Sequence, residues 1–279
     1  MRDTLLIILV LNALVVGVKV VVGFRTGALS VLGAALESTL DMLNNVVGIV
    51  LVRLAAREPD DDHPYGHAKF ETLGALGIAG FLSITCFELL REGVRHLLGG
   101  GRPETPSVAE IALIMATLVI NLFVVRYERK RGKELKSPFL LADAAHTNSD
   151  IYVTAAALGS LFLTRYGWGA IDPVLAIVVA LVIAWNGYLI VRGTVPVLVD
   201  ERGVDAAELR REAFAVTGVL VVRLARSRRL ASGVLSAEVV IGVAAELTVA
   251  DAHGLADDVE RRIKEQLGAS DVLVHVEPV

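Results

Sequence analysis

Apolar residues occur in six long blocks that fill most of the first 195 positions of the chain. Each block is close to the ~20 residues that a membrane-spanning helix needs. Charged residues gather between the blocks and are rare inside them. The pattern therefore predicts an α-helical membrane domain over residues 1–195 with six transmembrane helices, near residues 4–23, 30–52, 72–90, 108–126, 140–163 and 171–191.

Beyond Arg192 the pattern changes, because residues 200–279 are charged and alternate between helical and strand periodicity. A helix ending at Leu267, before Gly268, begins at a cap supplied by Thr248 or Asp251. The other predicted elements are a helix at 205–216 and strands at 219–226, 236–243 and 271–276. This order, α-β-β-α-β, predicts a small metallochaperone-like α/β domain that is too short to hold a deep catalytic cleft.

Composition narrows the class of protein further. The chain is 54% hydrophobic and 21% charged, more apolar than soluble domains usually are, so a lipid bilayer is the expected surrounding. It has no basic low-complexity tail, and we expect no nucleic-acid partner. The single cysteine, Cys86, excludes an internal disulfide and a thiolate metal cluster. The connections after the second and fourth blocks together carry nine Lys and Arg residues, against five in the other three connections, which predicts a multi-pass protein of the cell (inner) membrane with both termini in the cytoplasm.

Two pairs of potential metal ligands interrupt the apolar blocks. Glu37 and Asp41 are four residues apart, as are His146 and Asp150, so each pair lies on one helical face. Ionisable groups inside a membrane are costly and mark ion pathways. Together the four offer a tetrahedral site for Zn²⁺ or another divalent metal, unless they only face water or cap helix ends. Asp143, one turn before His146, either orients the imidazole or is an interfacial carboxylate.

The polar segment after the second block is a second candidate metal site. Asp60, His63 and His67 are closely spaced there. Pro64 and Gly66 break helical structure, so the two histidines do not form the helical H-E-x-x-H motif of a metalloprotease. The three residues are either metal ligands on a loop or part of a solvated acidic turn.

In these motifs the chain resembles the cation diffusion facilitators over essentially its whole length. The resemblance rests on three segments, GALSVLGAALESTLD, DDDHPYGHAKFE and AHTNSD. It implies a second metal site at the loop residues and a transport site at Glu37, Asp41, His146 and Asp150. The family usually has Asp or His where this chain has Glu37, whose longer side chain puts a zinc preference in question.

The resemblance also implies metal ligands in the C-terminal domain. His253, His275 and Glu277 match ligand positions, whereas Arg223 and Val240 stand where the family has histidine. Neither replacement can ligate a metal. We therefore expect no binuclear site there, but either one weak site at the three matching residues or a plain surface cluster.

The function that the resemblance implies is efflux of a divalent cation by a homodimeric proton antiporter that is not an enzyme and uses no organic cofactor. Zn²⁺ is the first candidate, followed by Fe²⁺, Mn²⁺, Co²⁺ and Cd²⁺. Residues 1–195 would form the transport domain, and residues 200–279 a cytoplasmic regulatory and dimerisation domain. The chemistry agrees, because ligands must lose protons to bind a metal, and helices can rock around a midplane site. A passive cation channel, a membrane metalloenzyme and a metal sensor that moves no ion are the alternatives.

Overall fold

The computed structural model describes the chain except for residues 1, 27–28, 99–106, 166–170 and 231–232. Some further side chains within helices, including that of Glu37, are also outside the described part. The chain divides into two compact units, Met1–Thr194 and Val195–Val279. Each unit has a hydrophobic core of its own.

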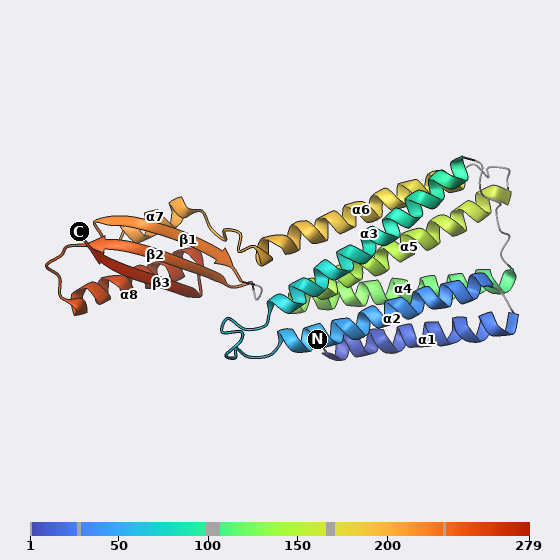
Figure 1. Ribbon diagram of the computed structural model, residues 1–279, viewed down its shortest axis with the longest axis horizontal. Coiled ribbons are helices and arrows are strands. Elements are labelled where there is room, and N and C mark those ends of the chain that lie inside the picture. The colour runs from blue at the N-terminus through green and yellow to red at the C-terminus, as the bar shows by residue number, and fades with distance from the viewer. Residues whose placement is uncertain (1, 27–28, 99–106, 166–170, 231–232) are drawn as a thin grey trace. The chain divides into compact units, whose positions relative to one another are not determined.

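Within the described residues, the first unit consists of six helices of 25 to 29 residues, which lie side by side (Figure 1). A helix lies at each of the six predicted positions, and most of them extend beyond the predicted bounds at one or both ends; that all six span a membrane stays a prediction. Their bounds are Arg2–Thr26 for α1, Leu29–Ala55 for α2, Lys69–Leu97 for α3, Val108–Leu135 for α4, Pro138–Arg165 for α5 and Ile171–Leu198 for α6.

Four of these helices, α1, α3, α4 and α6, are long and apolar enough to cross a membrane, as far as the described residues go. On α1, apolar side chains such as Val10, Leu14 and Phe24 are exposed, while Leu5 and Ile8 are buried. A helix that is apolar on all sides suits lipid around the bundle. The two remaining helices, α2 and α5, carry the paired candidate metal ligands.

The predicted end of the fourth span is wrong, because α4 continues from residue 126 to Leu135. The charged run that suggested a loop consists largely of Arg, Lys and Glu, which favour helix. Arg131 and Glu134 also pair along the helix at 2.8 Å. The extension places Glu128 inside α4, where it is fully buried.

Close packing around Phe139 fixes the start of α5 against α2 and α3. Phe139 is 1% exposed. A Cβ atom added to Gly48 on α2 would lie 2.2 Å from Cζ of this ring, and one added to Gly74 on α3 would lie 2.9 Å from Cδ2. Only glycine allows so close an approach at Gly48. Phe139 lies about two turns before His146, so this contact sets the position of α5 near the paired ligands.

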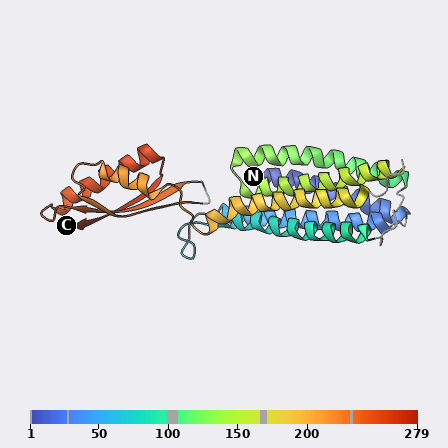
Figure 2. The ribbon, with the colours of Figure 1, turned by 90° about the horizontal axis from the view of Figure 1, so that it is seen from above.

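The second unit contains a three-stranded sheet with two helices on one face, which Figure 2 shows from above. Strands β1 and β2 are antiparallel, and β2 and β3 are parallel. The bounds are Ala206–Phe214 for α7, Val221–Arg229 for β1, Leu235–Val243 for β2, Val249–Leu267 for α8 and Asp271–Pro278 for β3. The predicted order of elements is confirmed. Thr248, not Asp251, caps α8, and Gly268 ends it with a φ of 67°.

Candidate metal sites

Asp41 on α2 meets His146 and Asp150 on α5. Nε2 of His146 lies 3.1 Å from Oδ1 of Asp41 and 4.0 Å from Oδ2 of Asp150. One ligand atom from each residue lies within 4.8 Å of the other two. Ligands of a tetrahedral zinc ion at about 2.1 Å are roughly 3.4 Å apart, so small movements would let these atoms hold one ion. We call this group the α2–α5 cluster.

The α2–α5 cluster is partly open and has a charge that suits a divalent cation. The side chains of His146, Asp41 and Asp150 are 13%, 32% and 28% exposed. With both carboxylates ionised and the imidazole neutral, which is the state that ligates a metal, the group carries two negative charges. Nδ1 of His146 has no hydrogen-bond partner among the described residues.

Two further residues on α2 share the face of Asp41. Glu37 lies one turn earlier, but its side chain is outside the described part, so its place as a fourth ligand stays a prediction. Asn45 lies one turn later and was not singled out from the sequence. It is 3% exposed, and its Oδ1 has no partner among the described residues. Its four-residue spacing from Asp41 was the available signal, since amide oxygens also ligate hard cations.

Asp60, His63 and His67 also come together, on the loop between α2 and α3. Oδ1 of Asp60 lies 3.3 Å from Nδ1 of His63, and Oδ2 lies 3.3 Å from Nε2 of His67. The imidazole rings are 4.3 Å apart. His67 is 3% exposed and its Nδ1 has no partner among the described residues, whereas the side chains of His63 and Asp60 are 45% and 50% exposed. We call this group the loop cluster, and its role as a metal site stays a prediction.

The loop cluster is ordered by its own carboxylate. The backbone N–H of His63 donates to Oδ1 of Asp60 at 2.7 Å. Gly66 closes the turn onto the carbonyl of His63 with a φ of +81°, which favours glycine. The His63 N–H, and then the two nearby imidazoles, hold the pKa of the Asp60 carboxyl below its usual value, against a smaller opposing effect of burial. Asp60 is therefore ionised over the neutral range.

A hydrogen-bond chain joins the start of α3, just after the loop cluster, to the start of α5. The hydroxyl of Ser137 donates to Oε1 of Glu71 on α3. The same hydroxyl accepts the backbone N–H of Leu140 on α5 at 3.1 Å. Ser137 is fully buried. Glu71 thus takes part in capping a helix that belongs to another part of the sequence.

Asp143 has neither of the two roles predicted for it, which were to orient the His146 imidazole or to be a carboxylate at the membrane interface. It is 3% exposed, so it is not an interfacial carboxylate. Its Oδ2 and Nδ1 of His146 both lack a hydrogen-bond partner among the described residues, so it does not orient the imidazole through those atoms. Instead, it lies within hydrogen-bonding reach of Glu128 on α4. Glu128 was missed because its helix was expected to end two residues earlier.

The residues matched in the C-terminal domain do not gather into one group of ligands among the described residues of this chain. His253 on α8 is exposed and lies 3.8 Å from Asp257. His275 on β3 lies 4.0 Å from Glu277, which pairs with Nε of Arg223 at 3.0 Å. Arg223 thus engages the carboxylate that a metal would need.

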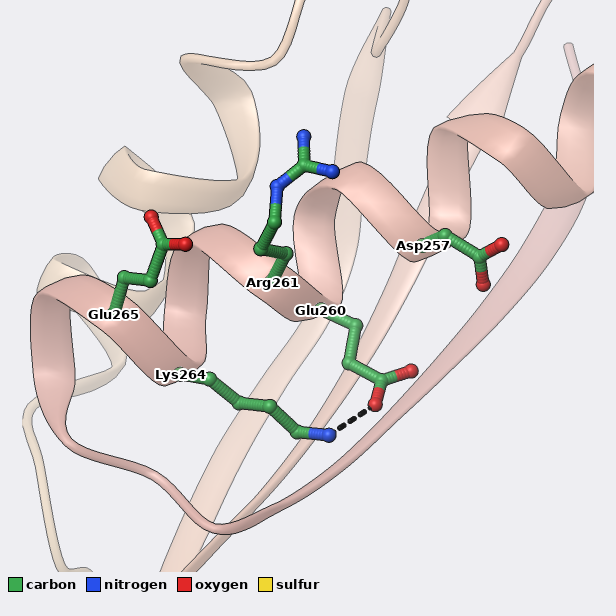
Figure 3. A pocket seen from close by; sticks show the side chains of 5 residues that line it. All are labelled: Asp257, Glu260, Arg261, Lys264 and Glu265. Carbon is green, nitrogen blue, oxygen red and sulfur yellow. Dashed lines mark hydrogen bonds and ion pairs between the residues drawn. The ribbon is translucent and has the colours of Figure 1, made fainter.

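The charged side of α8 offers a shallow pocket but no candidate site (Figure 3). Its lining residues are charged side chains on successive turns, and Lys264 pairs with Glu260. Such pairs four residues apart are usual on solvated helices and contribute little stability. The α2–α5 and loop clusters remain the candidate metal sites.

Comparison with known proteins identifies the family of the chain. The cation efflux transmembrane domain matches residues 5–199, and the cytoplasmic domain of cation efflux proteins matches residues 202–279. The manganese efflux system protein MneS of Bacillus subtilis is 28% identical over 94% of this chain and 90% of its own length. The cation-efflux pump FieF of Escherichia coli K12 is 28% identical over 94% of this chain and 87% of its own.

Among solved structures, a MamM C-terminal domain is 26% identical over 26% of this chain and 92% of its own, with a TM-score of 0.25. The two family domains together cover nearly all of the sequence. The chain therefore belongs to the cation efflux family, the cation diffusion facilitators, whose members are multi-pass membrane transporters of divalent metal cations and not enzymes.

Proposed function

We propose that this protein exports a divalent transition metal from the cytoplasm in exchange for protons, with the α2–α5 cluster as its transport site. The observation that carries the proposal is the contact of His146 with Asp41 and Asp150 across two helices of the bundle. A metal can bind there only after the imidazole and carboxylates have lost their protons. Protons on the outer side then compete for the same atoms and release the metal.

The membrane arrangement is part of the proposal. All six helices of the first unit cross the bilayer, so α2 and α5 place the cluster between the two surfaces. Both termini and residues 200–279 lie in the cytoplasm, where Lys and Arg of the α2–α3 and α4–α5 connections also lie. Two copies of the chain form a homodimer through the C-terminal domain, which regulates the transport domain.

The types of ligand limit which metals the site can transport. The site offers one imidazole and several carboxylates but no thiolate, so it suits Zn²⁺ but also Mn²⁺, Fe²⁺, Co²⁺ and Cd²⁺. Asn45 and Glu37 would add oxygen atoms, which harder cations such as Mn²⁺ prefer. The similarity to a manganese efflux protein supports including Mn²⁺ beside Zn²⁺ in any assay.

The test is a metal panel in proteoliposomes with an imposed pH gradient. We expect metal flux that follows the proton gradient in the wild type and is lost in Asp150→Ala, with the dimer intact. Glu88→Gln is the matched control, because this exposed carboxylate on α3 belongs to neither cluster. Flux that ignores the gradient would indicate a channel, binding without flux would indicate a sensor, and normal flux in Asp150→Ala would refute the site.

A further inference from the structure

Two carboxyl groups are buried together between α4 and α5, outside the α2–α5 cluster. Glu128 is 0% exposed and Asp143 is 3% exposed. No ion pair to either residue occurs among the described residues. Burying a charge without a partner is strongly unfavourable, and two neighbouring carboxylates worsen it by repulsion. Something must therefore neutralise at least one of these groups.

The hydrogen bonds indicate what neutralises the pair. The two carboxyl groups lie within hydrogen-bonding reach of each other. The hydroxyl of Thr147 approaches Oε2 of Glu128 at 3.2 Å. Oε1 of Glu128 and Oδ2 of Asp143 have no partner among the described residues. Two carboxylates only accept hydrogen bonds, so a proton on one of them supplies the missing donor for both groups.

We propose that Glu128 and Asp143 share one proton and form a proton-binding site that is separate from the metal ligands and exchanges its proton when metal binds. This proposal rests on the proton-coupled transport proposed above. It assigns to the pair a role that the metal ligands do not fill, because the pair releases and takes up a proton without itself binding the ion.

The charges that face the pair explain why metal would displace this proton. His146 on α5 and Asp41 on α2 act electrostatically on Asp143, and Asp150 on α5 acts on Glu128. These are the three residues of the α2–α5 cluster. A divalent cation among them repels a proton on the pair and attracts the doubly ionised pair. Departure of the cation reverses both effects, so the pair takes up a proton again.

The experiment measures Zn²⁺ affinity of the full-length protein in detergent as a function of pH, with Zn²⁺ as the only added metal. The slope of log affinity against pH reports the protons released on binding. Glu128→Gln keeps the shape of the side chain and a hydrogen-bond donor but cannot release a proton near neutral pH. We expect its slope to fall by one proton over the pH range in which the metal-free pair still holds its proton and the metal-bound pair has lost it, so that its affinity deficit grows about tenfold per pH unit within that range.

Asp143→Asn keeps the test decisive if the first variant does not fold, because it should lose the same proton. The double variant should lose no more than either single variant, since the pair holds one shared proton. Unchanged slopes in the folded variants, or loss of two protons in the double variant, would overturn the proposal. Glu88→Gln should match the wild type. A wild type that releases protons on binding but moves none during metal transport would instead refute the antiport mechanism.

Discussion

Replacing Gly48 by alanine should disrupt the α2–α5 cluster although Gly48 lies about two turns away from Asp41. The new Cβ would lie 2.2 Å from Cζ and 2.4 Å from Cε1 of Phe139. Carbon atoms in contact are about 3.5–4.0 Å apart, so roughly 1.5 Å of movement is needed. The ring cannot simply retreat, because Gly74 of α3 packs closely against it. The last turns of α2 and the first turns of α3 and α5 must therefore separate.

The size of the effect follows from this movement. Forcing extra carbon into a packed core usually costs about 1–3 kcal/mol. Nε2 of His146 lies 3.1 Å from Oδ1 of Asp41. If the movement estimated above separates these two atoms further, they can no longer bind the same ion. If that cost appears as lost metal binding, Zn²⁺ affinity falls by roughly 5- to 150-fold, since 1.4 kcal/mol corresponds to tenfold.

The assay combines thermal unfolding with Zn²⁺ titration of the purified protein. Gly80→Ala on α3 is the control, because a Cβ added there meets nothing within 4 Å. Phe139→Leu shortens the side chain that meets the new methyl group, so the double variant Gly48→Ala with Phe139→Leu should bind Zn²⁺ better than Gly48→Ala alone. If Gly48→Ala matches Gly80→Ala, or if Phe139→Leu does not restore any binding, the packing argument fails.

Three other predictions concern individual residues. Glu37→Asp should raise the ratio of Zn²⁺ to Mn²⁺ transport in a competition assay, and an unchanged ratio would place Glu37 away from the metal. The lowered pKa of Asp60 means that its contribution to loop order is present at neutral pH and is lost only as pH falls through that lowered value. The protection factor of the His63 amide, which corrects for the pH dependence of intrinsic exchange, should therefore persist down to about pH 4, the usual range for aspartate, and fall only at lower pH. The segment 200–279 should fold and dimerise without metal. It should bind at most one Zn²⁺ weakly, because Arg223 pairs with Glu277. Calorimetry that finds two tightly bound ions per chain would contradict this.

The sequence was most informative where one periodic pattern decides the structure. Apolar blocks of ~20 residues predicted the six helices, and alternating patterns predicted the order of the C-terminal elements. The spacing of His146 and Asp150 placed both on one face of α5, and a matching pair predicted that Asp41 would meet them. These inferences need only local geometry and the expense of ionisable groups in an apolar helix.

The sequence was least informative where two distant segments meet. Glu128 follows an apolar block and begins a charged run, so its local pattern indicates a solvated residue. Its burial depends on how α4 packs against α5, which no local pattern encodes. The same holds for the hydrogen bond from Ser137 to Glu71, since the two residues are far apart in the chain. Helix ends were uncertain because Arg, Lys and Glu suit both helices and surface loops.

The bond between Glu71 and Ser137 makes the beginnings of α3 and α5 a shared pivot. A helix fixed at one end moves in proportion to the distance from that end. A 10° tilt of α5 about Ser137 would shift His146 by about 2 Å, but would shift the far end of this 28-residue helix by about 7 Å. The tilt that separates His146 from Asp41 on α2 would therefore move the opposite end of α5 several times as far.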